Sequence, residues 1–315
     1  MRTLWVLCVL FITFASPATA APDKDKSCKK LPKEMASALG SAIHQKDEFV
    51  VHYHATGPNA IQEKADLNGN TIPDAVEDVA TKLIAMREML TSNGFVHPFK
   101  QPRYQQVRQI HAIMLPVKGN GVAYESPRTM PDGTCALIIH VDNDVSSENI
   151  TPAHELFHLF QYGYTMFKRP WYLEGMARWS ESMLRATPPK TAPLPKSNAE
   201  LTAFFDKKYD AVGVWYALTT GVDPVGQIKV PESAANLRYV SGKKMVQDDK
   251  LPGVAFMRAV LEGLDKLDDQ ISTAQGLTPF GWSESMQRDQ KHDLPMWKLI
   301  ETLYHTHGPT GRAAP

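Results

Sequence analysis

The spacing of apolar residues changes along the chain, from the short runs of strands to the three-and-four spacing of helices. Apolar runs at 49–53, 107–117 and 135–141 predict strands, and a shorter run at 121–124 predicts another. The run at 135–141 is almost unbroken, which is typical of a strand buried on both faces. These strands all precede residue 150.

Helical spacing prevails in the rest of the chain. Helices are predicted over 75–90, 151–161, 171–184, 199–220 and 253–272. A proline-rich break at 188–195 follows the third of them. The last forty residues are polar and compatible with helix, and they suggest no chemistry. Because strands prevail before residue 150 and helices after it, the sequence predicts an α+β fold with a small mixed sheet.

His154, Glu155 and His158 form the pattern H-E-x-x-H within the helix predicted to start near Thr151. Residues four apart share a helix face, so both imidazoles can point toward one metal ion, with Glu155 beside them. Thr151 is expected as the N-cap and Pro152 at the first helical position. The alternative is a pair of core histidines with a helix-capping glutamate.

A catalytic zinc ion usually has three protein ligands and one open position for water. One extended pattern takes the third ligand from a histidine six residues after the second, but that position is Tyr164 here. Another takes a glutamate from a second helix, and Glu174, sixteen residues after His158, meets that requirement. The small residues Gly175 and Ala177 would let the second helix pack closely on the first. The alternative for Glu174 is a solvated glutamate that opens a helix.

With these residues the chain resembles the glutamate-type zinc metallopeptidases, or gluzincins, and more narrowly a group of secreted bacterial proteins classed as metalloproteases. The blocks that carry the resemblance are 49–53, 56–60, 66–77, 136–144, 151–164 and 171–181. Only the metal motif and 66–77 are individually specific. The residues after about 220 have no counterpart in the resemblance.

The resemblance implies a zincin-like catalytic domain over 101–220, with zinc bound by His154, His158 and Glu174. It also implies that Glu155 is the general base in the hydrolysis of a peptide or protein substrate, by an endopeptidase rather than an exopeptidase. The shortest predicted strand would then pair with an extended substrate backbone.

Two positions depart from the pattern of this class. Many of its members have an aspartate four residues beyond the glutamate ligand, which supports a zinc-bound histidine, and here that residue is Arg178. Glu181 is the candidate replacement, with a plain surface glutamate as the alternative. The class also needs a donor for the developing oxyanion, and Tyr209 is the first candidate and Tyr216 the second. The alternative for either tyrosine is a buried core position.

Residues 66–77 have the ligand spacing of an EF-hand-like calcium loop. The oxygen donors would be five side chains and one backbone carbonyl, from Asp66, Asn68, Asn70, Ile72, Asp74 and Glu77. Such hard oxygen ligands suit Ca²⁺ better than zinc, and the resembling family carries the same loop. Thr71 stands where glycine is expected and Pro73 stiffens the loop, so the alternative is an Asn-Gly turn before a capped helix. A calcium ion here would be structural.

The first twenty residues combine a short basic start, an apolar stretch and a cleavage site of small residues at 18–20. These features are typical of a secretory signal peptide. Cys8 would be removed with residues 1–20; the alternative is an uncleaved N-terminal anchor. The expected location is therefore secreted or periplasmic. In such an oxidising compartment Cys28 and Cys135 most simply form a disulfide, and the alternative is two unpaired buried thiols.

Lysine plus arginine balance aspartate plus glutamate at 34 each, which gives no reason to expect nucleic acid or an anionic membrane as a partner. The oligomeric state has no signature in the sequence. The predicted divisions are a signal peptide, a tail or pro-segment, a part with the calcium-like loop, the catalytic core and a helical C-terminal part: 1–20, 21–48, 49–100, 101–220 and 221–315.

The sequence thus favours a secreted zinc-dependent metallopeptidase with a structural calcium ion. Two alternatives remain open. The first is a catalytically inactive binding module, stabilised by zinc and calcium on the same scaffold, and Arg178 motivates it. The second is a metallohydrolase that acts on another kind of bond, because a metal site does not by itself name the bond that is cleaved.

Overall fold

Six strands and ten α-helices make up the described part of the chain, residues 28–185 and 187–308 of the computed structural model. The strands lie in one mixed sheet and most helices follow it in sequence, which confirms the α+β fold. The signal peptide predicted for residues 1–20, including Cys8, lies outside the described residues. Within the described ranges, no helix is both long and apolar enough to cross a bilayer.

The sheet has the strand order β1-β5-β6-β4-β3-β2. Its strands are β1 (Lys29–Lys30), β2 (Ala42–Lys46), β3 (Phe49–Tyr53), β4 (Gln109–Met114), β5 (Gly121–Thr129) and β6 (Cys135–Val141). The central strands β3, β4 and β6 are parallel, whereas β2 is antiparallel to β3 and β5 is antiparallel to β6. The predicted strands are all present, although β4 is shorter and β5 longer than expected. Strands β1 and β2 were not predicted, because both are short and largely polar edge strands.

The helices are α1 (Lys33–Ala38), α2 (Asp74–Ser92), α3 (Thr151–Tyr164), α4 (Pro170–Ser180), α5 (Asn198–Phe205), α6 (Val212–Val222), α7 (Glu232–Ala235), α8 (Val254–Ala274), α9 (Glu284–Gln287) and α10 (Asp293–His307). After α4 the chain continues as one 3₁₀ turn, η4 (Glu181–Met183). The single helical stretch predicted for 199–220 is wrong. Lys208 has φ −124° and ψ −108°, so the chain turns there into the 3₁₀ helix η5 (Tyr209–Ala211) before α6 begins.

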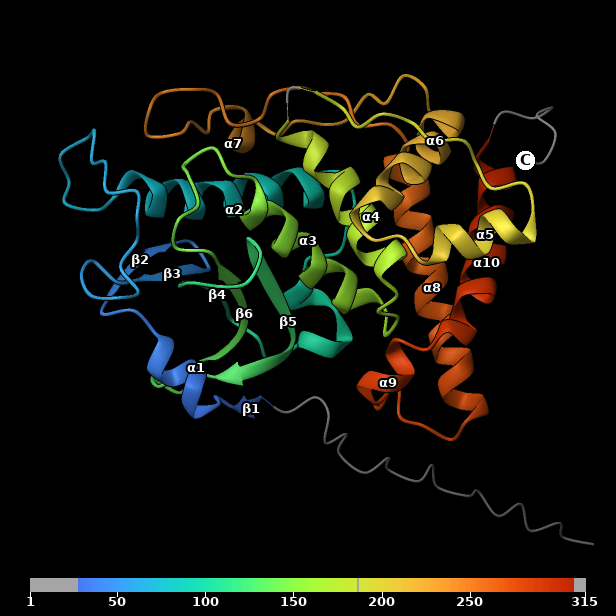
Figure 1. Cartoon of the computed structure of the whole chain (residues 1–315), viewed down its shortest axis with the longest axis horizontal. Helices are drawn as coiled ribbons and strands as arrows, with labels where there is room; N and C mark the ends of the chain where they lie inside the picture. Colours follow the sequence, from blue (N-terminus) through green and yellow to red (C-terminus); the bar gives the residue numbers. More distant parts are fainter. Residues whose placement is uncertain (1–27, 186, 309–315) are drawn as a thin grey trace, which may run out of the picture.

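The sheet has a buried surface on each face. Leu137, Ile139 and Val141 of β6 belong to the main core, which includes residues of α2, α3 and the later helices. Ala136 and Ile138 alternate with them and pack in a smaller cluster near α1 on the other face. The prediction that this strand is buried on both faces is therefore confirmed. Figure 1 shows α2 and α3 lying along the sheet, with α5, α6, α8 and α10 gathered to one side of it.

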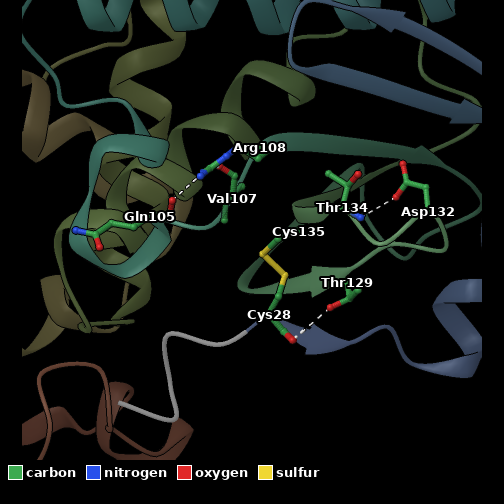
Figure 2. The surroundings of a disulfide bond; sticks show 8 residues. All are labelled: Cys28, Gln105, Val107, Arg108, Thr129, Asp132, Thr134 and Cys135. Carbon is green, nitrogen blue, oxygen red and sulfur yellow. Dashed lines mark hydrogen bonds between the residues drawn. A yellow bond between two sulfur atoms is a disulfide. The ribbon is translucent and has the colours of Figure 1, made fainter. Parts of the chain in front are cut away.

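A disulfide joins Cys28, just before β1, to Cys135 at the start of β6, with 5.8 Å between the two Cα atoms. This confirms the predicted pairing. β1 runs beside the far end of β5, where Thr129 Oγ1 donates a hydrogen bond to the Cys28 carbonyl over 3.3 Å (Figure 2). The disulfide and this short pairing hold the start of the described chain against the edge of the sheet.

Candidate metal centre

Helix α3 places the two histidines of the H-E-x-x-H pattern on one face. Almost every residue of α3 is buried, and the His154 and His158 rings lie 4.6 Å apart between centroids, nearly perpendicular. The helix starts one residue earlier than predicted. Thr151 is its first residue rather than the N-cap, and its N–H donates to the Asn149 side-chain oxygen over 2.8 Å. Asn149 therefore caps one of the free N–H groups at this end.

Glu174, from the first turns of α4, completes a group of three donors. Its Oε2 lies 3.1 Å from His154 Nε2 and 3.5 Å from His158 Nε2, and the three ligand atoms all lie within 4.8 Å of one another. Two atoms that share a tetrahedral zinc ion at ordinary bond lengths are separated by roughly 3.3 Å. The predicted convergence of these three side chains is therefore present, and the distances from Glu174 to the two Nε2 atoms are close to this value.

The second nitrogen of each histidine has a partner that fixes the ring. His154 Nδ1 lies 2.7 Å from Glu181 Oε1, and His158 Nδ1 lies 2.8 Å from Gln161 Oε1. When Nδ1–H donates to these oxygens, the Nε2 atom of each ring is left as the ligand atom for a metal ion, which is the arrangement that metal-binding histidines usually have. Glu181 thus lies where the supporting acid was expected. Gln161 was missed, although its position three residues after His158 on the same helix was a usable signal.

The charges around the histidines favour an added positive charge. Burial alone would lower the pKa of His154, but hydrogen bonds with Glu174 and Glu181 raise it to about 9. Burial alone would raise the pKa of Glu174, but hydrogen bonds from His154 and His158 hold it below its ordinary value. An environment that stabilises an extra proton among buried ligands also suits a divalent cation, and this agrees with the donor set.

Glu155 lies on the side of the site that faces β5. Its side chain is buried, and burial raises the pKa of its carboxyl, while His158 and His154 lower it and the Ala123 N–H, a hydrogen-bond donor, does the same. A Cβ atom on Gly121 would lie 2.9 Å from Glu155 Cγ and Oε1, so only glycine leaves the room that this carboxylate occupies. The edge of the sheet therefore positions Glu155 beside the three ligands.

Of the two candidate tyrosines, the structure brings only Tyr209 to the site. Tyr209 is 48% exposed, its ring centroid lies 5.9 Å from that of His154, and its hydroxyl interacts with Glu174. The Arg178 guanidinium lies over the Tyr209 ring at 5.2 Å. Tyr216, in α6, is packed in the main core and does not line the cavities beside the site.

Two cavities, of about 720 Å³ and 420 Å³, flank the candidate ligands. Gly121, Glu155 and Tyr209 line both of them, so together they form one cleft with the ligands near its middle. Glu284 and Arg288, which flank or belong to α9, line the smaller cavity. The C-terminal residues to which the sequence assigned no chemistry thus form part of the cleft.

C-terminal residues also fix the connection between α3 and α4, on which the relative position of the ligands depends. Asp268 accepts a hydrogen bond from the Met166 N–H over 2.6 Å. Asp293 accepts from Arg169 Nε over 2.7 Å and from the Trp171 indole N–H over 2.6 Å. These aspartates are buried and far from the site in sequence, so no local motif could have revealed them.

Several predicted donors of the calcium-like loop are engaged in hydrogen bonds within the loop. Glu77 accepts hydrogen bonds from the side-chain amides of Asn68 and Asn70, each over 2.9 Å. Asp66 accepts from the backbone N–H groups of Asn70 and Thr71 over 3.1 and 2.9 Å. Hydrogen bonds within the loop therefore engage four of the predicted residues, two of them through their side-chain amides and two through their carboxylates.

Two further residues of the loop have other contacts. Asp74 is buried and accepts from the Leu67 N–H over 3.0 Å, and the Ile72 N–H donates to Asn70 Oδ1 over 2.8 Å. Thr71 has φ +71°, the left-handed conformation that glycine supplies in loops of this type. Its presence instead of glycine therefore does not prevent the turn, although a β-branched residue adopts this conformation at a cost.

Comparisons with protein-family models, with curated proteins and with solved structures found no match to this chain.

Proposed function

We propose that this chain is a zinc-dependent metallopeptidase of the gluzincin type. The observation that carries the proposal is the convergence of His154, His158 and Glu174, with 3.1 and 3.5 Å between the carboxylate and the two Nε2 atoms. Glu155 beside them supplies the base that hydrolysis requires. The contact between Glu181 and His154 supports catalysis over the inactive module, because it provides the supporting acid that Arg178 does not.

The residues of the cleft would divide the chemistry as follows. A zinc ion held by the three ligands supplies Lewis acidity, which lowers the pKa of a water ligand and polarises the substrate carbonyl. Glu155 accepts a proton from the attacking water and then donates it to the leaving nitrogen. Tyr209, whose hydroxyl lies near the ligands, donates a hydrogen bond to the oxyanion as negative charge develops there.

An extended peptide fits the open part of strand β5. β1 pairs with β5 only at Arg128 and Thr129, so in the described chain the backbone groups of β5 nearer to Gly121 have no neighbouring strand on that side. A substrate backbone can add there as another strand. Cavities on both sides of Glu155 leave room for the chain before and after the scissile bond, which supports an endopeptidase. The disulfide is typical of an oxidising compartment and supports a secreted or periplasmic location.

The test is the Glu155→Gln variant, measured beside Glu232→Gln, an exposed glutamate of α7 that makes the same change in charge. Glu155→Gln should retain zinc, by elemental analysis, and lose about a thousandfold or more in kcat on a fluorogenic peptide library. Chelation of the wild-type protein should abolish cleavage, and zinc should restore it. If Glu155→Gln cleaves at the wild-type rate, the mechanism is wrong. If zinc-loaded wild type cleaves no peptide, the peptidase assignment is wrong.

We also propose that the loop of residues 66–77 binds a structural calcium ion. The support is the EF-hand-like spacing of the donors, the hydrogen bonds that join Asn68 and Asn70 to Glu77, and the left-handed turn at Thr71. Rotating the two asparagine amides would turn their carbonyl oxygens inward as ligands. Calcium at about 100 times its Kd should raise the free energy of unfolding by about 2.7 kcal/mol. The Asp66→Asn variant should lose this increase, and an unchanged response to calcium would contradict the proposal.

A further inference from the structure

The two cavities of the cleft differ in how their charges are balanced. In the smaller one, Lys168 lies 2.8 Å from Glu125 and 2.5 Å from Glu284, and Arg288 lies 2.6 Å from Glu284. These cations and carboxylates neutralise one another. Arg128 adds one more cation to the walls, but Glu155 and Glu174 add two carboxylates. A negatively charged group of a substrate would therefore gain little in this half of the cleft.

The larger cavity has four cations against three carboxylates, Glu148, Glu155 and Glu181, and we call it the cationic pocket. Lys118, Arg178, Arg185 and Lys243 line it. Two of them have strong partners: Arg185 lies 2.6 Å from Glu181, and Lys243 lies 2.8 Å from Glu148. Among the described residues, Lys118 and Arg178 have no comparable partner.

Arg178 reaches Glu181 only at 3.9 Å, and that carboxylate is already engaged by His154 at 2.7 Å. Around Lys118, no carboxylate of residues 28–185 or 187–308 lies within ion-pair distance. The N-terminus of α3, whose residues Ile150 and Thr151 line the same pocket, adds a favourable field for an anion. The pocket therefore presents two cations that a ligand can neutralise.

Arg178 is held where such a ligand would meet the reacting groups. It lies one helical turn after Glu174 on α4, and its guanidinium rests over the Tyr209 ring at 5.2 Å. A guanidinium fixed in this way keeps N–H groups available for a carboxylate, to which it binds in a planar, two-point manner. A carboxylate bound to Arg178 would thus lie close to the scissile bond.

We propose that the cationic pocket binds a carboxylate of the substrate through Arg178 and Lys118, and so selects peptides with a negative charge next to the scissile bond. The inference deepens the proposed peptidase function and rests on it. The carboxylate has two sources that the experiment distinguishes. A side chain of aspartate or glutamate agrees with the proposed endopeptidase, whereas the free C-terminus of the substrate would make the enzyme a carboxypeptidase. Both cations are partly or largely exposed, so we expect a preference of about fivefold over a neutral peptide.

The experiment measures binding and cleavage separately. Four fluorescein-labelled peptides differ only in Glu or Gln at one position and in a free or an amidated C-terminus. Their dissociation constants are measured by fluorescence anisotropy with zinc-loaded Glu155→Gln protein, which holds substrate without cleaving it. The Glu peptide, the free C-terminus, or both should bind about fivefold more tightly than the neutral peptide, and the pair that differs identifies the source.

Variants then assign the preference to its residues. In the same background, Lys118→Gln with Arg178→Gln should reduce the preference to less than twofold. Lys298→Gln removes one positive charge from an exposed position of α10 outside both cavities and should leave the preference intact. If the double variant does not fold, by circular dichroism, the single variant Lys118→Gln replaces it and should roughly halve the preference.

Equal affinity for all four peptides would overturn the inference, as would a preference that persists when Lys118 and Arg178 are replaced. Cleavage by the wild-type protein separates this result from the proposed function. Cleavage of charged and neutral peptides with the same kcat/KM would refute the cationic pocket and leave the peptidase standing. Tighter binding of the charged peptides without cleavage of any would refute the peptidase and leave the pocket standing.

Discussion

Gly121→Ala should impair catalysis through a single added methyl group. Gly121 has no left-handed backbone, so alanine fits its φ and ψ without strain. The new Cβ, however, would lie 2.9 Å from Glu155 Cγ and Oε1 and 2.6 Å from Thr151 Cγ2. Ordinary contacts of a Cβ begin at 3.4 Å, so Glu155 must retreat by about 0.5 Å, away from β5.

The size of the effect follows from this displacement. A misplacement of about 1 Å in a reacting group costs about a hundredfold in rate, so half of that distance should cost about tenfold in kcat. The three metal ligands do not touch Gly121, and we therefore expect the zinc content to be unchanged. Substrate binding along β5 can change as well, so kcat and KM have to be determined separately.

The assay is steady-state cleavage of a fluorogenic peptide, with zinc measured on the same samples. The double variant Gly121→Ala with Thr151→Ser separates two consequences of the methyl group. Removing Thr151 Cγ2 relieves its close contact and should recover any loss of thermal stability, but kcat should stay low because Glu155 is still displaced. A wild-type kcat in Gly121→Ala, with zinc bound, would refute the idea that Gly121 makes room for the base.

Three further predictions concern the support of the site and the fold. Glu181→Ala removes the carboxylate 2.7 Å from His154 Nδ1, and zinc affinity, measured by chelator competition, should fall about 10- to 100-fold. Asp293→Asn leaves the buried Arg169 without its anion and should lower the free energy of unfolding in urea by about 3 kcal/mol. Reduction of the Cys28–Cys135 disulfide, which spans 107 residues, should lower the free energy of unfolding by about 4 to 5 kcal/mol in the chain-entropy model.

Each of these predictions has an outcome that contradicts it. Unchanged zinc affinity in Glu181→Ala would mean that the hydrogen bond to His154 does not tune the metal. Asp293→Asn with wild-type stability would show that Arg169 finds another partner. Identical urea curves with and without reductant would show that the disulfide constrains the unfolded chain too little to matter.

Local sequence patterns were sufficient to predict the central strands and the three candidate metal ligands, His154, His158 and Glu174. The apolar run of β6 and the helical spacing around His154 are both local signals that span only a few residues. Glu174 follows His158 by sixteen residues, which is far enough along the chain to lie in a second helix. Edge strands such as β2 were missed because their side chains are mostly polar and exposed, and pairing with β3 supplies the order that their sequence lacks. The break at Lys208 was missed because the apolar spacing continues on both sides of it.

Long-range contacts explain the parts of the site that the sequence did not reveal. Arg178 stands where an aspartate was expected to support a zinc-bound histidine. Only the fold shows that Glu181 lies beside His154 in its place. Gly121 is one glycine among nineteen, and its importance depends on the approach of α3 to β5. The cleft walls near Arg288 come from a region without any motif, which tertiary packing brings to the site.

The anchoring of the α3–α4 connection has a consequence for the order of events during synthesis. Asp293 follows Arg169 by 124 positions, so a nascent chain carries His154, His158 and Glu174 long before the residue that locks their connection has been made. Until then the α3–α4 connection lacks the contacts that Asp293 makes with Arg169 and Trp171. The proposed hydrolytic activity would accordingly arise late, after most of the polypeptide has left the ribosome.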